Sequence, residues 1–194
     1  MNYIKLDTIN STNDYLKSYS KTHDLPNFFY VLADAQTAGR GQREHTWQSE
    51  CCKNLLISFL VRPEFGLKKQ VLLNEIVSIA LVNLLQKHKI TEVQVKLPND
   101  IMSAGKKIAG ILIENTTKAQ KISQSIIGIG LNVNQTNFVN LPDAVSMKNR
   151  VNKDFDIATI AKELQKILQQ LFLSDEIAIH KQYNALSFFK PKQN

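Results

Sequence analysis

The chain has 194 residues, of which 43% are hydrophobic and 21% charged, an ordinary balance for a globular protein of one domain or of one domain with a small appendage. The net charge of +7 favours anionic partners such as a nucleotide, a nucleic acid or an acidic protein surface, although a lysine-rich solvated surface explains it equally well. No run of about 18 apolar residues occurs, which excludes a membrane span, and we expect no secretory signal because the N-terminal segment has no apolar region.

The first half of the chain predicts short strands and two helices. Residues 10–23 are predicted to form a helix that is capped by Asn10 or Ser11. Residues 69–89 carry apolar side chains at helical spacing and are long enough for a central core helix. The predicted strands of this half are 3–6, 28–35 and 54–62.

The second half continues with strands and ends in helices. The predicted strands are 93–97, 106–115 and 124–134, and a polar turn joins the last two. Residues 154–173 form a clear amphipathic pattern, and a shorter helix is expected to follow to about residue 186. Antiparallel strands with few helices indicate the α+β class, in which helices pack on one sheet.

Two cysteines, Cys51 and Cys52, are adjacent in the sequence. Adjacent cysteines make poor disulfide partners and poor metal pairs unless further ligands are present. Neither a CxxC nor an HExxH spacing occurs. We therefore predict a reduced, cytoplasmic protein without structural zinc.

The segment 36-QTAGRGQREHTW-47 fits neither helical nor strand periodicity. Two of the seven glycines flank Arg40, and the only tryptophan, Trp47, closes the segment. The pattern indicates a flexible, cationic loop that ends in one aromatic residue. We expect this loop to be mobile without ligand, because it has glycines, charges and few apolar anchors.

Glycines also mark the strand 127-IGIGLNVN-134. Its odd-numbered positions are apolar, whereas the even-numbered positions are Gly128, Gly130, Asn132 and Asn134. One interpretation is an exposed sheet face with turn residues at its end. The other is a flat floor for a ligand, on which the Asn132 amide pairs with a purine edge.

A second candidate site surrounds Gly110. Lys107 lies three residues earlier, on the opposite parity of an ideal strand, but its long side chain could still reach over Gly110. A solvated surface lysine is the alternative. The turn 96-KLPND-100 presents Asp100, either as part of an ordinary turn or as a carboxylate for Mg²⁺ or proton transfer near phosphates.

Four segments now stand in order along the chain: 11-STN-13, 34-DAQTAGRGQREHTW-47, 96-KLPNDIMSAGKKIAGILIE-114 and 128-GIGLNVN-134. Together they resemble the catalytic domain of biotin–protein ligases, from about residue 3 to about residue 186. The resemblance implies an α+β fold of the class II aminoacyl-tRNA synthetase-like type, with a mixed, largely antiparallel sheet and helices packed on one side. It predicts a catalytic domain over 1–187 and a tail over 188–194, with no N-terminal helix-turn-helix and no C-terminal β-barrel domain.

The resemblance also implies a two-step reaction. The carboxylate of biotin attacks the α-phosphate of ATP, with Mg²⁺ present, to give biotinyl-5′-AMP and pyrophosphate. A lysine of an acidic biotin carboxyl carrier domain then attacks the mixed anhydride, and AMP leaves. The protein is expected to be a monomer or a homodimer without specific DNA binding.

By resemblance, the catalytic residues are Lys107 and Arg40, which stabilise charge where carboxylate and phosphate meet. Biotin would be bound by Ser11, Thr12, Asn13, Gln36, Gly39, Arg40, Gly41, Gln42, Lys107, Gly110 and Leu112. ATP would be bound by Arg40, Trp47, Asn99, Asp100, Lys107 and Asn132. Asp100 is the candidate Mg²⁺ ligand.

The chain departs from the family pattern at several positions. Gln42 stands where some members have a second arginine, Glu44 where many have glycine, and Leu97 where many have tryptophan. An inactive ligase fold is therefore one alternative. A lipoate–protein ligase is another, although the SGGG-type segment expected of that group is absent.

Overall fold

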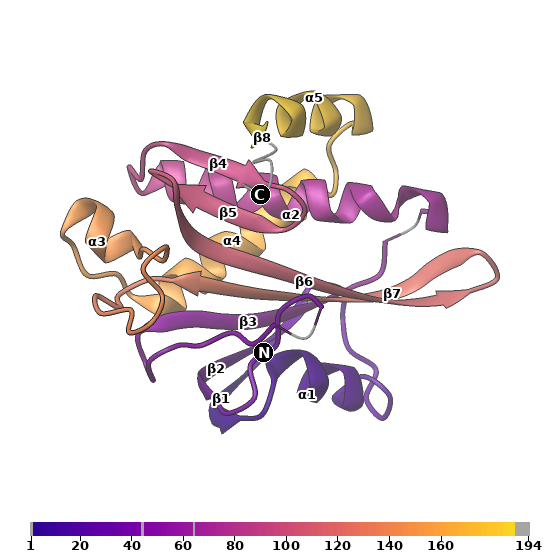
Figure 1. The fold of residues 1–194 in the computed structure, drawn as a ribbon. Helices are drawn as coiled ribbons and strands as arrows, with labels where there is room; N and C mark the ends of the chain where they lie inside the picture. The colour runs from indigo at the N-terminus through magenta and orange to yellow at the C-terminus, as the bar shows by residue number, and fades with distance from the viewer. Residues whose placement is uncertain (1, 44, 64, 189–194) are drawn as a thin grey trace.

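The computed structural model describes residues 2–43, 45–63 and 65–188, which form one mixed sheet and its covering helices (Figure 1). The eight strands are ordered β1-β2-β3-β7-β6-β5-β4-β8 across the sheet. Their bounds are β1 Tyr3–Ile9, β2 Phe29–Gln36, β3 Asn54–Val61, β4 Val93–Lys96, β5 Asp100–Ser103, β6 Lys106–Lys118, β7 Lys121–Asn132 and β8 Ser187–Phe188. The helices are α1 Thr12–Tyr19, α2 Gln70–Lys87, α3 Met147–Val151, α4 Ile157–Leu171 and α5 Glu176–Leu186, with a 3-10 turn at Leu67–Lys69.

Five of the seven strand pairs are antiparallel, and only β1–β2 and β4–β8 are parallel. The longest pairing joins β6 and β7 in a hairpin that projects beyond the sheet (Figure 1). The predicted α+β class and the mixed, largely antiparallel sheet are therefore confirmed.

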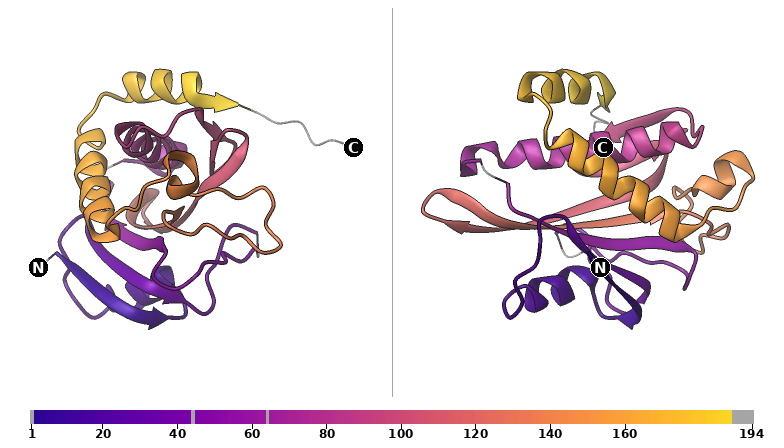
Figure 2. Two further views of the ribbon diagram at one scale, coloured as in Figure 1. Left: turned by 90° about the vertical axis from the view of Figure 1, so that its left-hand side faces the viewer. Right: turned by 180° about the vertical axis from the view of Figure 1, so that it is seen from behind.

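Strand β3 explains why the sheet is covered on both faces. All eight of its residues are buried, which excludes a strand with one wet side. Ile57 and Phe59 point into the main core with α2 and α4, whereas Leu60 points to a smaller cluster that contains Leu16 of α1. Figures 1 and 2 show α2, α4 and α5 on one face and α1 alone on the other. The expectation that the helices share one side is wrong for α1, because a strand buried on both faces needs a cover on each.

Helix α2 is the central core helix that the sequence predicts. Twelve of its eighteen residues are buried, in contact with α4, α5 and the strands β4 to β6. A helix that is apolar all round belongs in the middle of a layered fold. In the part of the chain that the structure describes, no helix combines the length and the apolarity needed to cross a membrane.

Most element boundaries differ from the predictions by a few residues. Helix α1 begins after the Ser11 cap but ends at Tyr19, and β6 and β7 extend to a turn at Ala119 and Gln120 because polar residues continue the ladder beyond the apolar run. Phe188, assigned to the tail, pairs with Lys96 instead. Glu44 and the remaining tail residues, 189–194, lie outside the described residues.

Two leucines, Leu81 and Leu173, differ widely in solvent exposure. Leu81 of α2 is fully buried, whereas Leu173, beyond the end of α4, is 89% exposed. We predict that Leu81→Ala lowers the free energy of unfolding by about 2–5 kcal/mol, because it removes buried methyl groups and leaves a cavity. The matched variant Leu173→Ala should change it by no more than about 0.5 kcal/mol. Urea denaturation measures both, and equal effects would contradict the assigned core.

Candidate active site

A cavity of about 290 Å³ lies on the α1 face of the sheet, where the four sequence segments meet. Its walls come from the start of α1, the loop around Arg40, the turn before β5, and the neighbouring strands β6 and β7. It is lined by thirteen of the predicted site residues: Ser11, Thr12, Asn13, Gln36, Arg40, Gly41, Gln42, Trp47, Asn99, Asp100, Lys107, Gly110 and Leu112. Segments that are far apart in the sequence thus converge at one cavity.

The indole of Trp47 lies on a pair of glycines. Gly110 and Gly130 are opposite one another in the β6–β7 ladder. A Cβ atom at Gly130 would be 2.4 Å from Trp47 Cε2, and one at Gly110 would be 3.1 Å from Trp47 Cζ3. Only residues without a side chain admit the ring this close to both strands.

The predicted ligand floor is therefore covered by the protein itself. Trp47 occupies the space above Gly130, and Asn13 occupies the space above Gly128, where an added Cβ would be 2.3 Å from the amide oxygen. The prediction that these glycines allow close approach is correct, and the approaching groups in this structure are Trp47 and Asn13. Gly110, Gly128 and Gly130 still line the cavity beside them, and the binding of a ligand on these strands stays a prediction.

A bulge in β6 aims Lys107 into the cavity. Lys107 is opposite Met102 of β5 and Ala109 is opposite Ile101, so Ile108 is the extra residue. The extra residue reverses the strand parity, and a Cβ atom at Gly110 would lie 3.5 Å from Lys107 Nζ. In an ideal strand, Lys107 and Gly110 would lie on opposite faces. Because of the bulge, both lie on the same face, and the side chain of Lys107 reaches over Gly110.

Lys107 is held between an aromatic ring and a carboxylate. Its Nζ atom lies 2.6 Å from Asp100 Oδ1 and 5.6 Å from the centroid of the Trp47 ring. Asn99 fixes the preceding turn by donating to the Ile111 carbonyl at 2.8 Å. The cation is therefore placed at the junction of loop, turn and strand before any ligand is bound.

The Asp100 carboxylate is paired with Lys107 in this structure. The described residues contain no group of three or more His, Cys, Asp or Glu side chains that could hold a metal ion. Mg²⁺ at a nucleotide site usually takes only one or two protein carboxylates together with phosphate and water oxygens. The role of Asp100 as an Mg²⁺ ligand therefore stays a prediction.

The start of α1 is joined to the sheet by a chain of hydroxyl and amide groups. Ser58 Oγ lies 2.7 Å from Thr12 Oγ1 and 2.6 Å from Asn13 Oδ1, and Thr12 donates to Gln36 Oε1 from both its backbone N–H and its hydroxyl. Sequence reasoning missed Ser58, which is fully buried in β3. One signal was available, since Ser58 is a lone hydroxyl in the apolar strand NLLISFLV.

The loop that carries Arg40 is closed by its own hydrogen bonds. Gly41 N–H donates to the His45 carbonyl at 2.6 Å, and Trp47 N–H donates to the Gly39 carbonyl at 2.9 Å. An antiparallel bridge joins Arg40 and Thr46. Gly39 does not line the cavity; a Cβ there would be 2.6 Å from the Trp47 carbonyl oxygen, so this glycine lets the loop close. The mobility of the loop without ligand stays a prediction.

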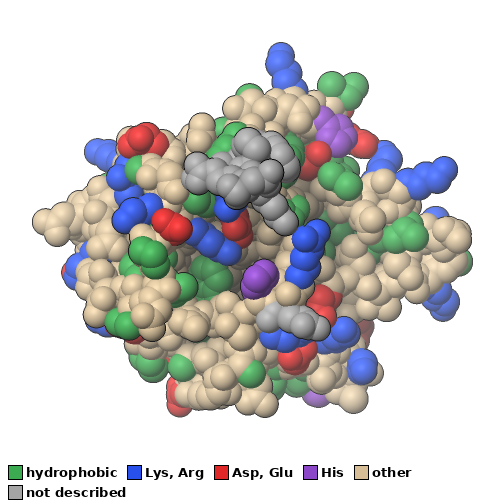
Figure 3. Space-filling view, in the orientation of Figure 1, with side chains coloured by type: hydrophobic (Ala, Val, Ile, Leu, Met, Phe, Trp, Pro, Cys, Tyr) green, Lys and Arg blue, Asp and Glu red, His purple; other side chains and the backbone are tan. Residues whose placement is uncertain are grey.

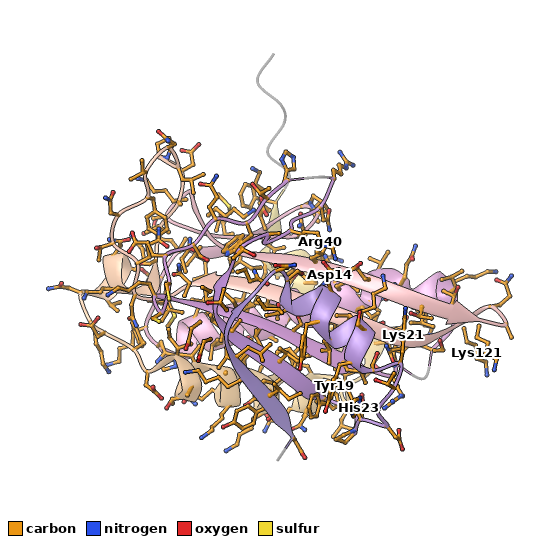
Figure 4. All side chains as sticks on the ribbon, turned by 90° about the horizontal axis from the view of Figure 1, so that it is seen from below. Asp14, Tyr19, Lys21, His23, Arg40 and Lys121 are labelled. Carbon is orange, nitrogen blue, oxygen red and sulfur yellow. The ribbon has the colours of Figure 1, made fainter. Side chains whose placement is uncertain are left out.

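The Arg40 guanidinium lies between two carboxylates on the rim of the cavity. Its Nη2 atom is 2.6 Å from Asp14 Oδ1 and 3.0 Å from Glu114 Oε2, and Figure 4 shows Arg40 beside Asp14 at the first turn of α1. Burial acts to raise the pKa of Glu114, but the hydrogen bond from Asn13 and the charges of Arg40 and Lys17 hold that pKa below its usual value. The ionised carboxylate is therefore the stable form at this position.

A second cavity, of about 430 Å³, lies beside the first. Trp47 and Lys107 line both cavities, and Asn132 lines only the second. Asn132 is buried, and its Nδ2 atom donates to the Val145 carbonyl at 3.1 Å. The structure thus places Asn132 with Trp47 and Lys107 in the second cavity and uses one of its amide hydrogens to hold the chain around Val145.

Comparison with known proteins shows which sequences and structures the chain resembles. Residues 6–132 match the Biotin/lipoate A/B protein ligase family. The bifunctional ligase/repressor BirA of Bacillus subtilis (strain 168) is 37% identical over 129 residues, which are 63% of this chain and 40% of that protein. BirA of Escherichia coli (strain K12) is 36% identical over 128 residues, 66% of this chain and 39% of that protein. The chain thus spans about 40% of the length of these relatives.

The fold likeness extends over nearly all of the chain. Biotin protein ligase from Aquifex aeolicus in complex with biotin and ATP superposes with a TM-score of 0.82 and 25% sequence identity, over 96% of this chain and 78% of that protein. The shared fold therefore includes the C-terminal helices, which the family match over residues 6–132 does not reach.

The stacking of Trp47 on Gly130 can be tested with the fluorescence of the only tryptophan. We predict that Gly130→Ala displaces the ring and shifts its emission, because the added methyl group would lie 2.4 Å from it. Gly66→Ala is the matched control, since the nearest atom to its Cβ is 4.0 Å away. Unchanged emission in Gly130→Ala, with the fold retained by circular dichroism, would contradict the contact.

The lowered pKa of Glu114 predicts a pH-dependent contribution to stability. Because the folded pKa lies below the ordinary value of about 4.3, the contribution is fully present above that value and is lost as the pH falls through the folded pKa. The difference in unfolding free energy between the wild type and Glu114→Gln should therefore be constant near neutral pH and shrink in acid. Denaturant titrations across this range measure it. The control Glu92→Gln, at a largely exposed carboxylate, should show a smaller difference at every pH.

Proposed function

The chain belongs to the biotin/lipoate A/B protein ligase family, and we propose that it is an ATP-dependent biotin–protein ligase. In the proposed reaction it forms biotinyl-5′-AMP and then transfers biotin to a lysine of an acidic carboxylase carrier domain. One observation carries the proposal. Two adjacent cavities share Lys107 and Trp47 as a common wall. Two substrates that react head to head need such an arrangement.

The first cavity suits biotin. It has the apolar Trp47, Ile111 and Leu112 along its sides and the hydrogen-bonded group of Thr12 and Gln36 at the α1 end. The polar group has donors and acceptors for a ureido ring, while the apolar sides suit the bicyclic ring and the chain. The carboxylate of biotin would then point toward Lys107.

The second cavity is proposed to hold the nucleotide. Its walls include Phe138, Leu141 and Asn132, which offer apolar contacts and one amide for adenine. Its position beyond Trp47 would leave the α-phosphate beside Lys107. Any Mg²⁺ would enter with the phosphates, which supply oxygen ligands of their own.

Lys107 is assigned the central role in the chemistry. A carboxylate oxygen of biotin attacks the α-phosphorus, the bond to pyrophosphate breaks, and negative charge accumulates between the two anions. The Lys107 ammonium, kept in place by Asp100 at 2.6 Å, would stabilise that charge without reorganisation. In the second step the acceptor amine attacks the acyl carbon, its proton is lost to solvent or a nearby base, and AMP leaves.

Arg40 is assigned to the loop that covers the adenylate. In the structure its guanidinium is bound to Asp14 and Glu114. We infer that an anionic ligand competes with these carboxylates for Arg40, and that the loop closes over the ligand when the exchange occurs. A closed loop would protect the mixed anhydride from water.

ATP–pyrophosphate exchange tests this function directly. We predict exchange that depends on biotin and not on lipoate, and a decrease of about 10²- to 10³-fold in Lys107→Ala, the range found when one preorganised stabilising group is removed. The matched control is Lys106→Ala, a change of the exposed neighbour in the same strand.

The outcomes of this assay test the proposed function and the proposed role of Lys107 separately. Absence of exchange with biotin in the wild type would refute the ligase proposal. Biotin-dependent exchange that survives in Lys107→Ala would keep the function but remove Lys107 from its role.

A further inference from the structure

Cys51 and Cys52 form a pair of neighbouring thiols outside both cavities. Their Sγ atoms are 3.1 Å apart, and both residues are exposed. Neither residue lines the cavities around Trp47. The ligase reaction gives this pair no role, although two thiols at this separation are a reactive chemical group.

The turn that presents the two thiols is fixed by its backbone. Cys52 N–H donates to the Asp34 carbonyl at 2.9 Å, and the carbonyl of Lys53 accepts from Asn134 N–H at 2.7 Å. Cys52 has a positive φ of 62°, an uncommon backbone conformation for a residue other than glycine. The two sulfur atoms are thus held together by a turn anchored to β2 and to the end of β7.

The geometry disfavours a disulfide. The Cα atoms of neighbouring residues across a trans peptide are about 3.8 Å apart, whereas disulfides usually span roughly 4.4–6.8 Å. The sulfur atoms would also have to approach to about 2.05 Å. The expectation that adjacent cysteines are poor disulfide partners therefore agrees with the structure.

The same geometry suits one soft atom bonded to both sulfurs. With bonds of about 2.3 Å, as in metal thiolates, a separation of 3.1 Å corresponds to an angle of about 85° at the central atom. This angle suits a pyramidal centre better than a tetrahedral one. A four-ligand zinc site is not supported, since no cluster of three or more His, Cys, Asp or Glu exists among residues 2–43, 45–63 and 65–188.

We propose that Cys51 and Cys52 constitute a dithiol site that chelates one trivalent, monosubstituted arsenical. The reaction of R–As=O with the two thiols forms two As–S bonds, and the oxygen leaves as water with both thiol protons. No oxidation or reduction occurs, so no further reagent is required. The arsenical supplies its own third substituent, and two protein sulfurs complete the coordination.

The protonation of the pair is compatible with this reaction. The hydrogen bond with Cys51 is the main cause that raises the pKa of the Cys52 thiol. The Cys52 thiol therefore carries a proton, which departs in the water molecule formed on condensation. The nearby ion pair of Lys5 and Asp34, at 3.0 Å, leaves little net charge beside the thiols.

Phenylarsine oxide tests the site on the whole chain of 194 residues. Intact mass spectrometry should show one adduct per chain, with the loss of one water. Cys51→Ser and Cys52→Ser should each weaken binding by about 10²- to 10⁴-fold, because each removes the intramolecular second bond. A small dithiol should remove the arsenical, and a monothiol at the same thiol concentration should not.

Several outcomes would overturn the proposal. These are two adducts per chain, an unchanged affinity in either single variant, or release by the monothiol. Failure of the wild type to bind at micromolar concentrations would also overturn it. Since both cysteines are exposed, the serine variants should retain the circular dichroism spectrum of the wild type, and the comparison does not depend on ligase activity.

Discussion

The contact between the Trp47 ring and the paired glycines of β6 and β7 is the constraint on which the candidate site depends. Because Gly110 and Gly130 lack side chains, the ring lies directly on two strands and joins the loop of Arg40 to the sheet. The same ring separates the two cavities and contacts Lys107 by a cation–π interaction. A methyl group at either glycine would therefore affect the loop, the cavities and the lysine together.

The cations of the site are paired with carboxylates before a substrate arrives. Lys107 is paired with Asp100, and Arg40 with Asp14 and Glu114. On the face shown in Figure 3, basic and acidic side chains alternate rather than form one basic patch. The net charge of +7 is thus a poor guide to the site. Local pairing decides which cations are positioned, and the proposed anionic substrates would have to compete with these acids for them.

Several predictions from the sequence depended on features that are local in the chain. The core helix α2, the Ser11 cap and the β6–β7 hairpin follow from periodicity, capping chemistry and turn composition. The bulge at Ile108 was not predicted, because it depends on how β6 pairs with β5. Ser58 was missed for a similar reason, since its partners Thr12 and Asn13 come from a distant segment.

By itself, the sequence indicated the α+β class and the order of the motifs, and all but one of the residues that the resemblance assigned to the site line one of the two cavities. Only the tertiary structure decided which side chain covers each glycine, which carboxylate holds each cation and where Asn132 lies. Those outcomes depend on contacts between residues far apart in sequence. Packing on both faces of β3 and the register of β6 set these contacts, and no local pattern encodes either.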